Sequence, residues 1–230
     1  MEGKQIPGLG SPNHPDAMSV FTIDLEKNRV INKFKTGYLV GETVEDAEVV
    51  GGASPNSIAV CKQFAYVTNA SNDNVAIIDY TTQQIVGRIP ILVDKRIDKV
   101  RGHLPFGITM SKDEKTLYVA LLGFNAVAVI DIPSRTTKGL IPSGWGPTRV
   151  ELSHDDAYLY IITCRGWGAG PNGGAGFVAP VQGSSVSQIQ LGSFRRGKGP
   201  DRKRDGGGKG GDIGGRRVIQ KKNNTRLSAH

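Results

Sequence analysis

A stretch of 14 residues that occurs twice limits the fold of this chain more than any other feature. YVTNASNDNVAIID spans residues 66–79, and YVALLGFNAVAVID spans residues 118–131. Each copy predicts two short strands joined by a tight turn, because β-branched and aromatic residues flank a polar or Gly-containing centre. A degenerate third copy, GPTRVELSHDDAYLYIITC, covers residues 146–164. We therefore expect a repeat protein made of β-strands.

The spacing of the copies indicates which kind of repeat protein this is. Tyr66 and Tyr118 are 52 residues apart, and Tyr118 and Tyr160 are 42 apart; a charged insertion at 93–103 accounts for the difference. A period of about 40–45 residues with four strands per unit is typical of a β-propeller blade. A single four-stranded sheet cannot bury both of its faces, so such blades pack against one another. The predicted fold is all-β, with about four blades of four antiparallel strands.

The strands of this propeller are expected in consecutive units. The first full unit covers residues 54–92, the second covers 104–142, and the third begins at Gly146 and continues with a strand within 186–194. SVFTID at 19–24 matches VAIID and VAVID, and a second strand follows it to about Lys35. The predicted domains are an N-terminal loop (1–18), a partial propeller (19–194) and a C-terminal tail (195–230).

The tail carries the basic charge of the chain. Residues 195–230 hold twelve Lys and Arg against three Asp, whereas the other 194 residues hold 17 basic and 18 acidic groups. The tail also has too few apolar residues to bury a core, so we expect it to be disordered. It could bind polyanions nonspecifically, but it lacks the aromatic residues that stack on bases. Because the composition changes abruptly at Arg195, our hypothesis is a propeller fragment with a foreign, out-of-frame C-terminus.

Several of these segments resemble a known family. YVTN (66–69) with DNVAIID (73–79), and PFGITMSKD (105–113) with LYVA (117–120), resemble the YVTN-type β-propeller repeat. SPNHPD, GGASPNS and GAGPNGG resemble segments of YncE-like propellers of bacterial cell-envelope proteins. The resemblance implies about seven blades in a complete protein and a location in the periplasm or cell envelope. Some members are fused to an alkaline-phosphatase-like phosphoesterase domain.

Candidate ligand-binding residues lie where the inner strands are expected to begin. Asn56, Phe106 and Arg149 follow Pro55, Pro105 and Pro147, close to equivalent positions on the rim of the channel. The alternative is that each proline only sets the entry of its strand. Further candidates lie in loops: Asn13, His14 and His103 beside the Pro-containing segments, and Arg165, Trp167 and Asn172 in or beside the Gly-rich loop that follows Cys164.

No catalytic residue, metal site or cofactor is predicted. GAGPNG at 168–173 fits the GxGxxG spacing, but the helix that a dinucleotide site needs does not follow. A lactonase-like propeller needs acidic and Asn ligands on several inner strands, and SIAV, GITM and RVEL offer only Glu151. Cys61 and Cys164 are expected as free thiols buried in strands. His154 is expected in a hairpin turn, because SHDD matches SKDE.

These observations favour a non-catalytic β-propeller module for binding or scaffolding, cut from a larger bacterial cell-envelope protein. The alternatives are part of a propeller-linked phosphoesterase whose catalytic domain is absent here, or a lactonase-like propeller. The expected partners are an unidentified ligand or protein at the rim and further copies that associate through exposed blade edges. We find no apolar run of 18 residues that would span a membrane as a helix and no apolar core of a secretion signal.

Overall fold

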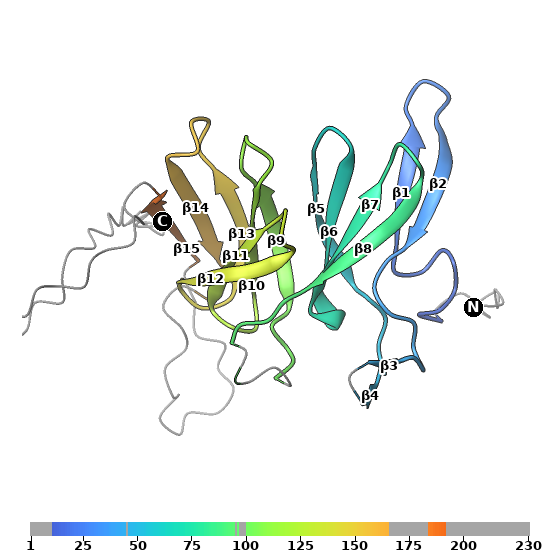
Figure 1. Ribbon diagram of the computed structural model, residues 1–230, viewed down its shortest axis with the longest axis horizontal. Helices are drawn as coiled ribbons and strands as arrows, with labels where there is room; N and C mark the ends of the chain where they lie inside the picture. The colour runs from blue at the N-terminus through green and yellow to red at the C-terminus, as the bar shows by residue number, and fades with distance from the viewer. Residues whose placement is uncertain (1–10, 45, 95, 97–99, 166–183, 192–230) are drawn as a thin grey trace, which may run out of the picture.

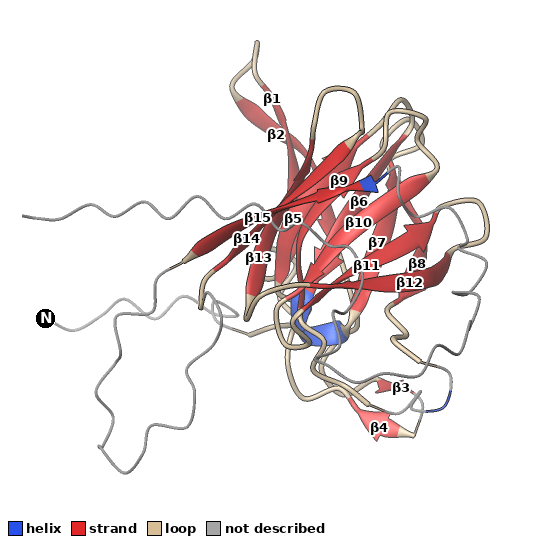
Figure 2. Ribbon diagram, turned by 90° about the vertical axis from the view of Figure 1, so that its left-hand side faces the viewer, coloured by secondary structure: helices blue, strands red, loops and turns tan. Residues whose placement is uncertain are grey.

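The computed structural model describes residues 11–44, 46–94, 96, 100–165 and 184–191. Antiparallel sheets make up nearly all of its regular structure (Figures 1 and 2). The first blade contains β5 (Pro55–Val60), β6 (Phe64–Asn69), β7 (Asn74–Asp79) and β8 (Gln84–Pro90), and the second contains β9 (Pro105–Met110), β10 (Thr116–Leu121), β11 (Ala126–Asp131) and β12 (Thr136–Pro142). The third sheet contains β13 (Pro147–Leu152), β14 (Tyr158–Thr163) and β15 (Ser185–Gln190).

Two hairpins and one short helix complete the described structure. The N-terminal hairpin pairs β1 (Ser19–Asp24) with β2 (Arg29–Lys35), and a small hairpin pairs β3 (Thr43–Val44) with β4 (Ala47–Glu48). A 3-10 helix, η1 (Ala70–Asn72), joins β6 to β7. Figure 1 shows the N-terminal hairpin, the two blades and the third sheet following one another across the molecule.

The strands of each blade follow chain order, and this order places the inner strands together. The sheets run β5-β6-β7-β8, β9-β10-β11-β12 and β13-β14-β15. β9 contacts both β5 and β13, so the first strands of successive sheets lie side by side. This is the arrangement of an incomplete β-propeller, in which the first strand of every blade is nearest to the axis.

Apolar side chains fill the space between successive sheets. One buried cluster joins Tyr66 and Ile77 of the first blade to Leu117 and Ile130 of the second. Another cluster joins the second blade to Val150, Leu159 and Ile161 of the third sheet. All six residues of β7 are buried, because the second blade covers one face of the first blade and the N-terminal hairpin covers the other. The expectation that VAIID is covered on both sides is confirmed.

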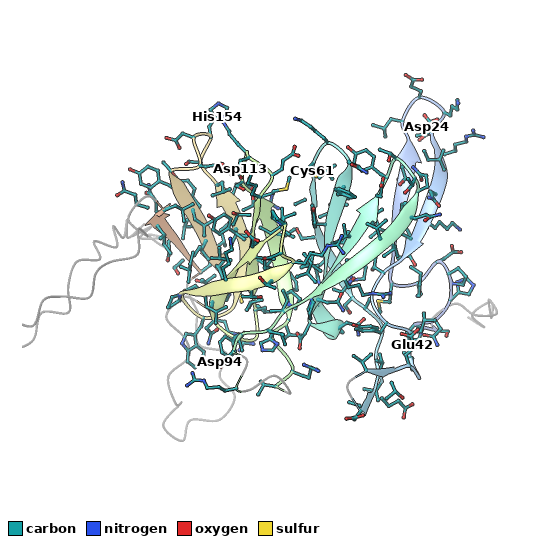
Figure 3. The ribbon with its side chains drawn as sticks, viewed as in Figure 1. Asp24, Glu42, Cys61, Asp94, Asp113 and His154 are labelled. Carbon is teal, nitrogen blue, oxygen red and sulfur yellow. The ribbon has the colours of Figure 1, made fainter. Side chains whose placement is uncertain are left out.

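Two kinds of turn repeat along the chain with the same side-chain bonds. Asp24, Asp79 and Asp131 end equivalent strands, and each accepts hydrogen bonds from the backbone amides of the turn that follows it. In the other kind, Ser111 Oγ bonds Asp113 Oδ1 at 2.6 Å, and Ser153 Oγ bonds Asp155 Oδ1 at 2.6 Å. His154 is an exposed residue of this second turn, as predicted. Figure 3 shows Asp24, Asp113 and His154 at one end of the molecule, and Glu42 and Asp94 at the other.

The structure differs from the predicted set of blades at its two ends. Among the described residues, two sheets have four strands, the third sheet has three, and the N-terminal hairpin has two. The segment at 37–53, predicted as a connection, also contains the β3–β4 hairpin. The strand predicted within 186–194 is β15. The tail at 195–230 lies outside the described residues.

The two cysteines are free thiols, as expected, but they are not buried in strands. Cys61 is half-buried in the turn after β5, where its amide donates a hydrogen bond to Phe64 O at 2.9 Å. Cys164 is exposed and follows the end of β14. The prediction of strand-buried thiols was wrong because both residues sit one position beyond their strands, where the chain turns away from the core.

Candidate binding site on the loop face

The end of the propeller at which the inner strands begin is called the loop face here. Each inner strand is entered through a residue with positive φ that directly precedes a proline: Ser54 (49°), Leu104 (51°) and Gly146 (63°). The carbonyls of these residues accept hydrogen bonds from Ala70, Leu122 and Cys164, the first residue after the second strand of each sheet. The proline segments therefore have a repeated structural role, because each one forms the corner through which its blade is entered.

A side chain from each complete blade accepts hydrogen bonds from the residues that lead into the next inner strand. Asp73 of the first blade accepts hydrogen bonds from the amides of Gly102 (2.6 Å) and Leu104 (2.9 Å), which lie just before β9. Asn125, the equivalent residue of the second blade, accepts one from the amide of Gly146 at 2.8 Å. Both residues have positive φ, a conformation that Asp and Asn tolerate better than most residues.

His103 is buried beside the Asp73 carboxylate. Its ring is 2% exposed, its Nδ1 lies 3.3 Å from Asp73 Oδ2, and the ring of Phe124 tilts against it with 5.6 Å between centroids. Burial acts to raise the pKa of the Asp73 carboxyl, but His103 and the two amide hydrogen bonds outweigh burial and lower that pKa below its ordinary value. Asp73 is therefore a carboxylate that holds two segments of chain together.

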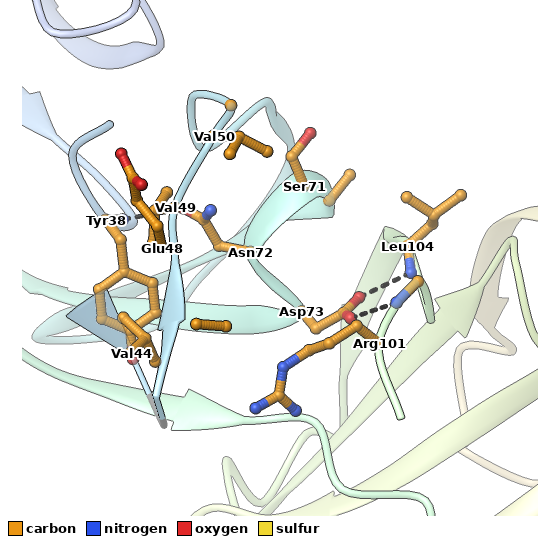
Figure 4. A pocket seen from close by; sticks show the side chains of 14 residues that line it. Tyr38, Val44, Glu48, Val49, Val50, Ser71, Asn72, Asp73, Arg101 and Leu104 are labelled. Atoms are coloured by element: carbon orange, nitrogen blue, oxygen red, sulfur yellow. Dashed lines mark hydrogen bonds between the residues drawn. The ribbon is translucent and has the colours of Figure 1, made fainter. Parts of the chain in front are cut away.

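A pocket of about 200 Å³ opens beside Asp73 on the loop face (Figure 4). Its walls come from the β3–β4 hairpin, from η1 and from the loop that leads to β9. The lining residues are Tyr38, Val44, Ala47, Glu48, Val49, Val50, Gly51, Ala70, Ser71, Asn72, Asp73, Arg101, Gly102 and Leu104.

Several polar groups of this pocket already have partners within the protein. Asn72 Oδ1 accepts a hydrogen bond from the amide of Tyr38 at 2.8 Å, and Ser71 Oγ bonds Ser54 Oγ at 3.0 Å. The guanidinium of Arg88 lies over the Tyr38 ring, 5.0 Å from its centroid. The pocket thus combines a fixed polar floor with an apolar wall of valines from the β3–β4 hairpin and the segment after it.

The predicted rim residues lie on inner strands but do not line this pocket. Asn56 is exposed and donates from Nδ2 to Ser54 O at 2.9 Å, while Phe106 is half-buried and its carbonyl accepts from Thr68 Oγ1 at 2.6 Å. Arg149 pairs with Ile162 in the third sheet, and Ser57 makes the equivalent pair with Thr68 in the first blade. Arg149 is therefore equivalent to Ser57, one position beyond the place of Asn56 and Phe106. Its Nη2 is 3.8 Å from Glu151 Oε2.

Asn13 and His14 belong to a loop that is tied to the N-terminal hairpin. Asn13 bonds both the amide and the carbonyl of Val40, at 2.8 and 2.9 Å. The ammonium of Lys35 donates to His14 O at 3.0 Å and also to the carbonyls of Pro12 and Ala17. Asn13 and His14 therefore have a structural role, because these bonds hold the SPNHPD loop against the hairpin.

Of the three remaining candidates, one lies on the loop face and two lie outside the described residues. Arg165 is exposed, and its amide bonds Trp145 O at 3.1 Å, just as the amide of Ser71 bonds Ala53 O at 3.2 Å. Arg165 therefore occupies on the third sheet the place that Ser71 occupies at the pocket. Trp167 and Asn172 lie outside the described residues.

The residues that shape the pocket were missed because they come from segments far apart in the sequence. The charged insertion was visible as a departure from the repeat, and it supplies Arg101, but no pattern linked it to the segment at 37–53. Among the described residues, no group of three His, Cys, Asp or Glu side chains is placed to hold a metal ion, and no helix is long and apolar enough to cross a membrane.

Comparisons with known proteins agree on the fold. No family model matches the chain. The seven-bladed β-propeller protein Rv1057 of Mycobacterium tuberculosis is 27% identical over 140 residues, which are 59% of this chain and 33% of that protein. The chain therefore spans about a third of the length of this curated relative.

A solved structure supports the same fold. Kuenenia stuttgartiensis hydrazine synthase superposes with a TM-score of 0.55 and 26% identity, over 78% of this chain and 42% of that chain. Virginiamycin B lyase from Staphylococcus aureus superposes with a TM-score of 0.48 and 12% identity, over 77% of this chain and 47% of that chain. The sheet order, the curated relative and the first of these structures together identify the fold as a β-propeller of which this chain forms part.

Proposed function

We propose that this chain is a non-catalytic β-propeller module that binds a protein partner through its loop face. The size of the pocket carries the proposal. Small-molecule sites usually enclose about 300–1,000 Å³, whereas this pocket encloses about 200 Å³. A pocket of that size, with an apolar wall and a polar floor, suits a single anchoring side chain of a partner better than a whole substrate.

The distribution of polar residues supports the same proposal. Polar residues that recur between blades, such as Asp79 and Asp131, hold turns. By contrast, Tyr38 and Arg101 come from segments that do not repeat, and they line the pocket together with Ser71, whose place is taken by Gly123 and Arg165 in the other sheets. Binding surfaces of repeat proteins are expected where repeats depart from one another on a common scaffold.

The larger protein to which this module belongs is also part of the proposal. The relative is described as seven-bladed and the chain spans a third of it, which supports a longer propeller. The resemblance to YncE-like propellers supports a place in the bacterial periplasm or cell envelope. We include both points in the proposed function.

A second candidate is a propeller that forms part of an enzyme. The likeness to hydrazine synthase, at 26% identity and a TM-score of 0.55, favours this alternative. The resemblance to propellers fused to a phosphoesterase domain favours it as well. In both cases the chemistry would be carried by parts of a longer protein, and this chain would supply binding surface.

The binding proposal can be tested with a random peptide library displayed on phage and panned against the purified chain. Ser71 is exposed at the pocket, so Ser71→Trp fills the pocket without disturbing the core. Lys62→Trp, in an exposed turn at the opposite end of the first blade, is the matched control. We expect enriched peptides to share an anchoring residue, and to lose at least tenfold in affinity for Ser71→Trp but not for Lys62→Trp.

Peptides that bind both variants as tightly as the unaltered chain would place the binding surface elsewhere. The enzymatic alternative is checked on the same preparations with p-nitrophenyl phosphate. Hydrolysis by the purified chain that disappears in Ser71→Trp would contradict a non-catalytic module.

A further inference from the structure

The corner that leads into the third sheet carries an exposed tryptophan. At each of the three corners, the residue before the corner residue accepts a hydrogen bond from the amide two positions after the second strand; these equivalent residues are Ala53, His103 and Trp145. Ala53 is 1% exposed and His103 is 2% exposed, whereas Trp145 is 46% exposed. Trp145 lies between the second blade and the third sheet, so its exposure arises where the described structure has a sheet on each side. A large aromatic side chain on the surface, at a position that the other corners bury, indicates a contact surface.

A second exposed aromatic residue lies beside this corner, on the second blade. Phe124 is 39% exposed. The residue after it, Asn125, accepts a hydrogen bond from the amide of Gly146 at 2.8 Å, which holds the segment that ends in Trp145 against the segment that carries Phe124. On its other side, the ring of Phe124 tilts against the ring of His103, with 5.6 Å between centroids.

The pocket on the loop face reaches the same segment of the second blade. Gly102 lines the pocket, and its carbonyl oxygen lies so close to Gly123 that a Cβ at position 123 would collide with it. Only glycine allows this close approach, which brings the rim of the pocket against the residue that precedes Phe124. The pocket, Phe124 and Trp145 therefore follow one another across the loop face, from the first blade to the third sheet. Figure 4 shows the pocket end of this line.

The third-sheet end of this line is positively charged. Arg165 is exposed, its amide bonds Trp145 O at 3.1 Å, and no ion pair joins it to a carboxylate of the described residues. Asp94, which lies at the same end of the molecule, already forms an ion pair with Arg96. At the pocket end the charges are mixed, because Glu48 and Arg101 both line the pocket. A partner that complements the loop face therefore needs a negative group at Arg165.

We propose that the loop face binds an extended peptide segment that has an aliphatic anchor in the pocket and an acidic residue opposite Arg165, an inference that rests on the proposed function. The pocket favours an aliphatic anchor because valines form its apolar wall. Between the anchor and the acidic residue, the peptide crosses the exposed rings of Phe124 and Trp145. Trp and Arg are among the residue types that contribute most binding energy at protein interfaces.

The probe is a phage-displayed library in which one fixed leucine is flanked on both sides by random residues. We expect panning against the unaltered chain to enrich Asp or Glu at a constant distance from the leucine. Panning against Arg165→Glu should instead enrich Lys or Arg at that distance, because the charge at this end is reversed. Lys62→Glu changes the net charge equally, in an exposed turn at the opposite end of the first blade, and should select the same acidic residue as the unaltered chain.

Calorimetry with the most enriched peptide tests the aromatic contacts. Trp145→Ala should bind this peptide at least tenfold more weakly. Phe21→Ala, which removes a 39% exposed ring from the N-terminal hairpin, is the matched control and should bind as the unaltered chain does. The loss caused by Arg165→Glu should shrink at high ionic strength, because salt screens exposed charges, whereas the loss caused by Trp145→Ala should persist.

Two results would overturn this partner chemistry while the proposed function stands. The first is a peptide that binds Ser71→Trp more weakly but binds Trp145→Ala as tightly as the unaltered chain. The second is selection of the same residues by Arg165→Glu and by the unaltered chain. If Trp145→Ala melts at a lower temperature, Trp145→Phe takes its place, with an expected loss of at least threefold. A library from which no sequence is enriched would overturn the proposed function and this inference together.

Discussion

Asp73→Asn is expected to loosen the junction between the two complete blades. The carboxylate of Asp73 uses one oxygen for the amide of Gly102 and the other for the amide of Leu104. Asn has a single acceptor oxygen, so one amide loses its partner and faces an NH₂ group instead. Asn tolerates positive φ as Asp does, so the backbone conformation at 46° adds no separate cost.

The magnitude follows from these two bonds. A hydrogen bond to a charged group contributes about 1.5–3 kcal/mol, and a neutral one contributes about 1 kcal/mol. Losing one charged bond and weakening the other should cost about 2–4 kcal/mol in the free energy of unfolding. Urea unfolding followed by circular dichroism measures this cost at pH 7. Asn125→Asp, which keeps an acceptor for its single amide, is the matched change and should cost less than about 0.5 kcal/mol.

The pH dependence gives a second measurement on the same variant. The pKa of Asp73 is lower in the folded chain than its ordinary value of 3.8, so the stability it contributes is complete above that value and is lost as the pH falls below it. The difference in stability between the unaltered chain and Asp73→Asn should therefore shrink as the pH is lowered from 5 toward 3. A difference below about 0.5 kcal/mol at pH 7, or one that stays constant with pH, would refute the reasoning.

Three further predictions concern the same framework. Leu117→Ala removes a fully buried side chain from the cluster between the blades and should cost about 2–5 kcal/mol in urea unfolding; a loss under 1 kcal/mol would contradict that packing. Gly107→Ala places a methyl group 2.6 Å from Thr148 O, so it should lower the melting temperature, and an unchanged one would show that β9 and β13 are not so close. Hydrogen bonds from Lys138 and, to a smaller extent, Ser134 hold the pKa of Asp131 at about 2. The stability from this carboxylate is therefore present above pH 3.8 and is lost as the pH falls toward 2. NMR titration of Lys138→Met should find a higher Asp131 pKa, and an unchanged pKa would remove Lys138 as the cause.

The blades could be predicted from local sequence because their strands and turns depend on local chemistry. β-branched residues specify strands such as β7, and Asp79 and Asp131 cap turns through bonds to residues two or three positions away. The hairpin turn at His154 was found for the same reason. The cysteines show the limit of this approach, because each lies one residue beyond the end of its strand, where Cys61 is half-buried and Cys164 is exposed.

The candidate site could not be predicted because it depends on contacts between distant residues. Asp73 and Leu104 are 31 positions apart, and Asn72 meets Tyr38 across 34. The contact between Asn72 and Tyr38 does not follow the repeat, since Tyr38 precedes the first full unit, and the contact between Asp73 and Leu104 recurs only as Asn125 with Gly146. The rim residues were placed by counting from prolines, and Arg149 lies two positions after Pro147, whereas Asn56 and Phe106 each lie one position after theirs.

The corners that open each blade have a consequence for how loops in this protein can vary. The connection from β8 to β9 spans residues 91–104 and that from β12 to β13 spans only 143–146, yet both end in a positive-φ residue whose amide is held by Asp73 or Asn125. The direction of the next strand is thus set after the loop has ended, whatever the length of the loop. Insertions on this end of the molecule can be lengthened, shortened or exchanged while the angle between blades stays the same. An engineer could graft new recognition segments there, between Asp94 and Gly102, keeping the buried Ile91 and without redesigning the sheets.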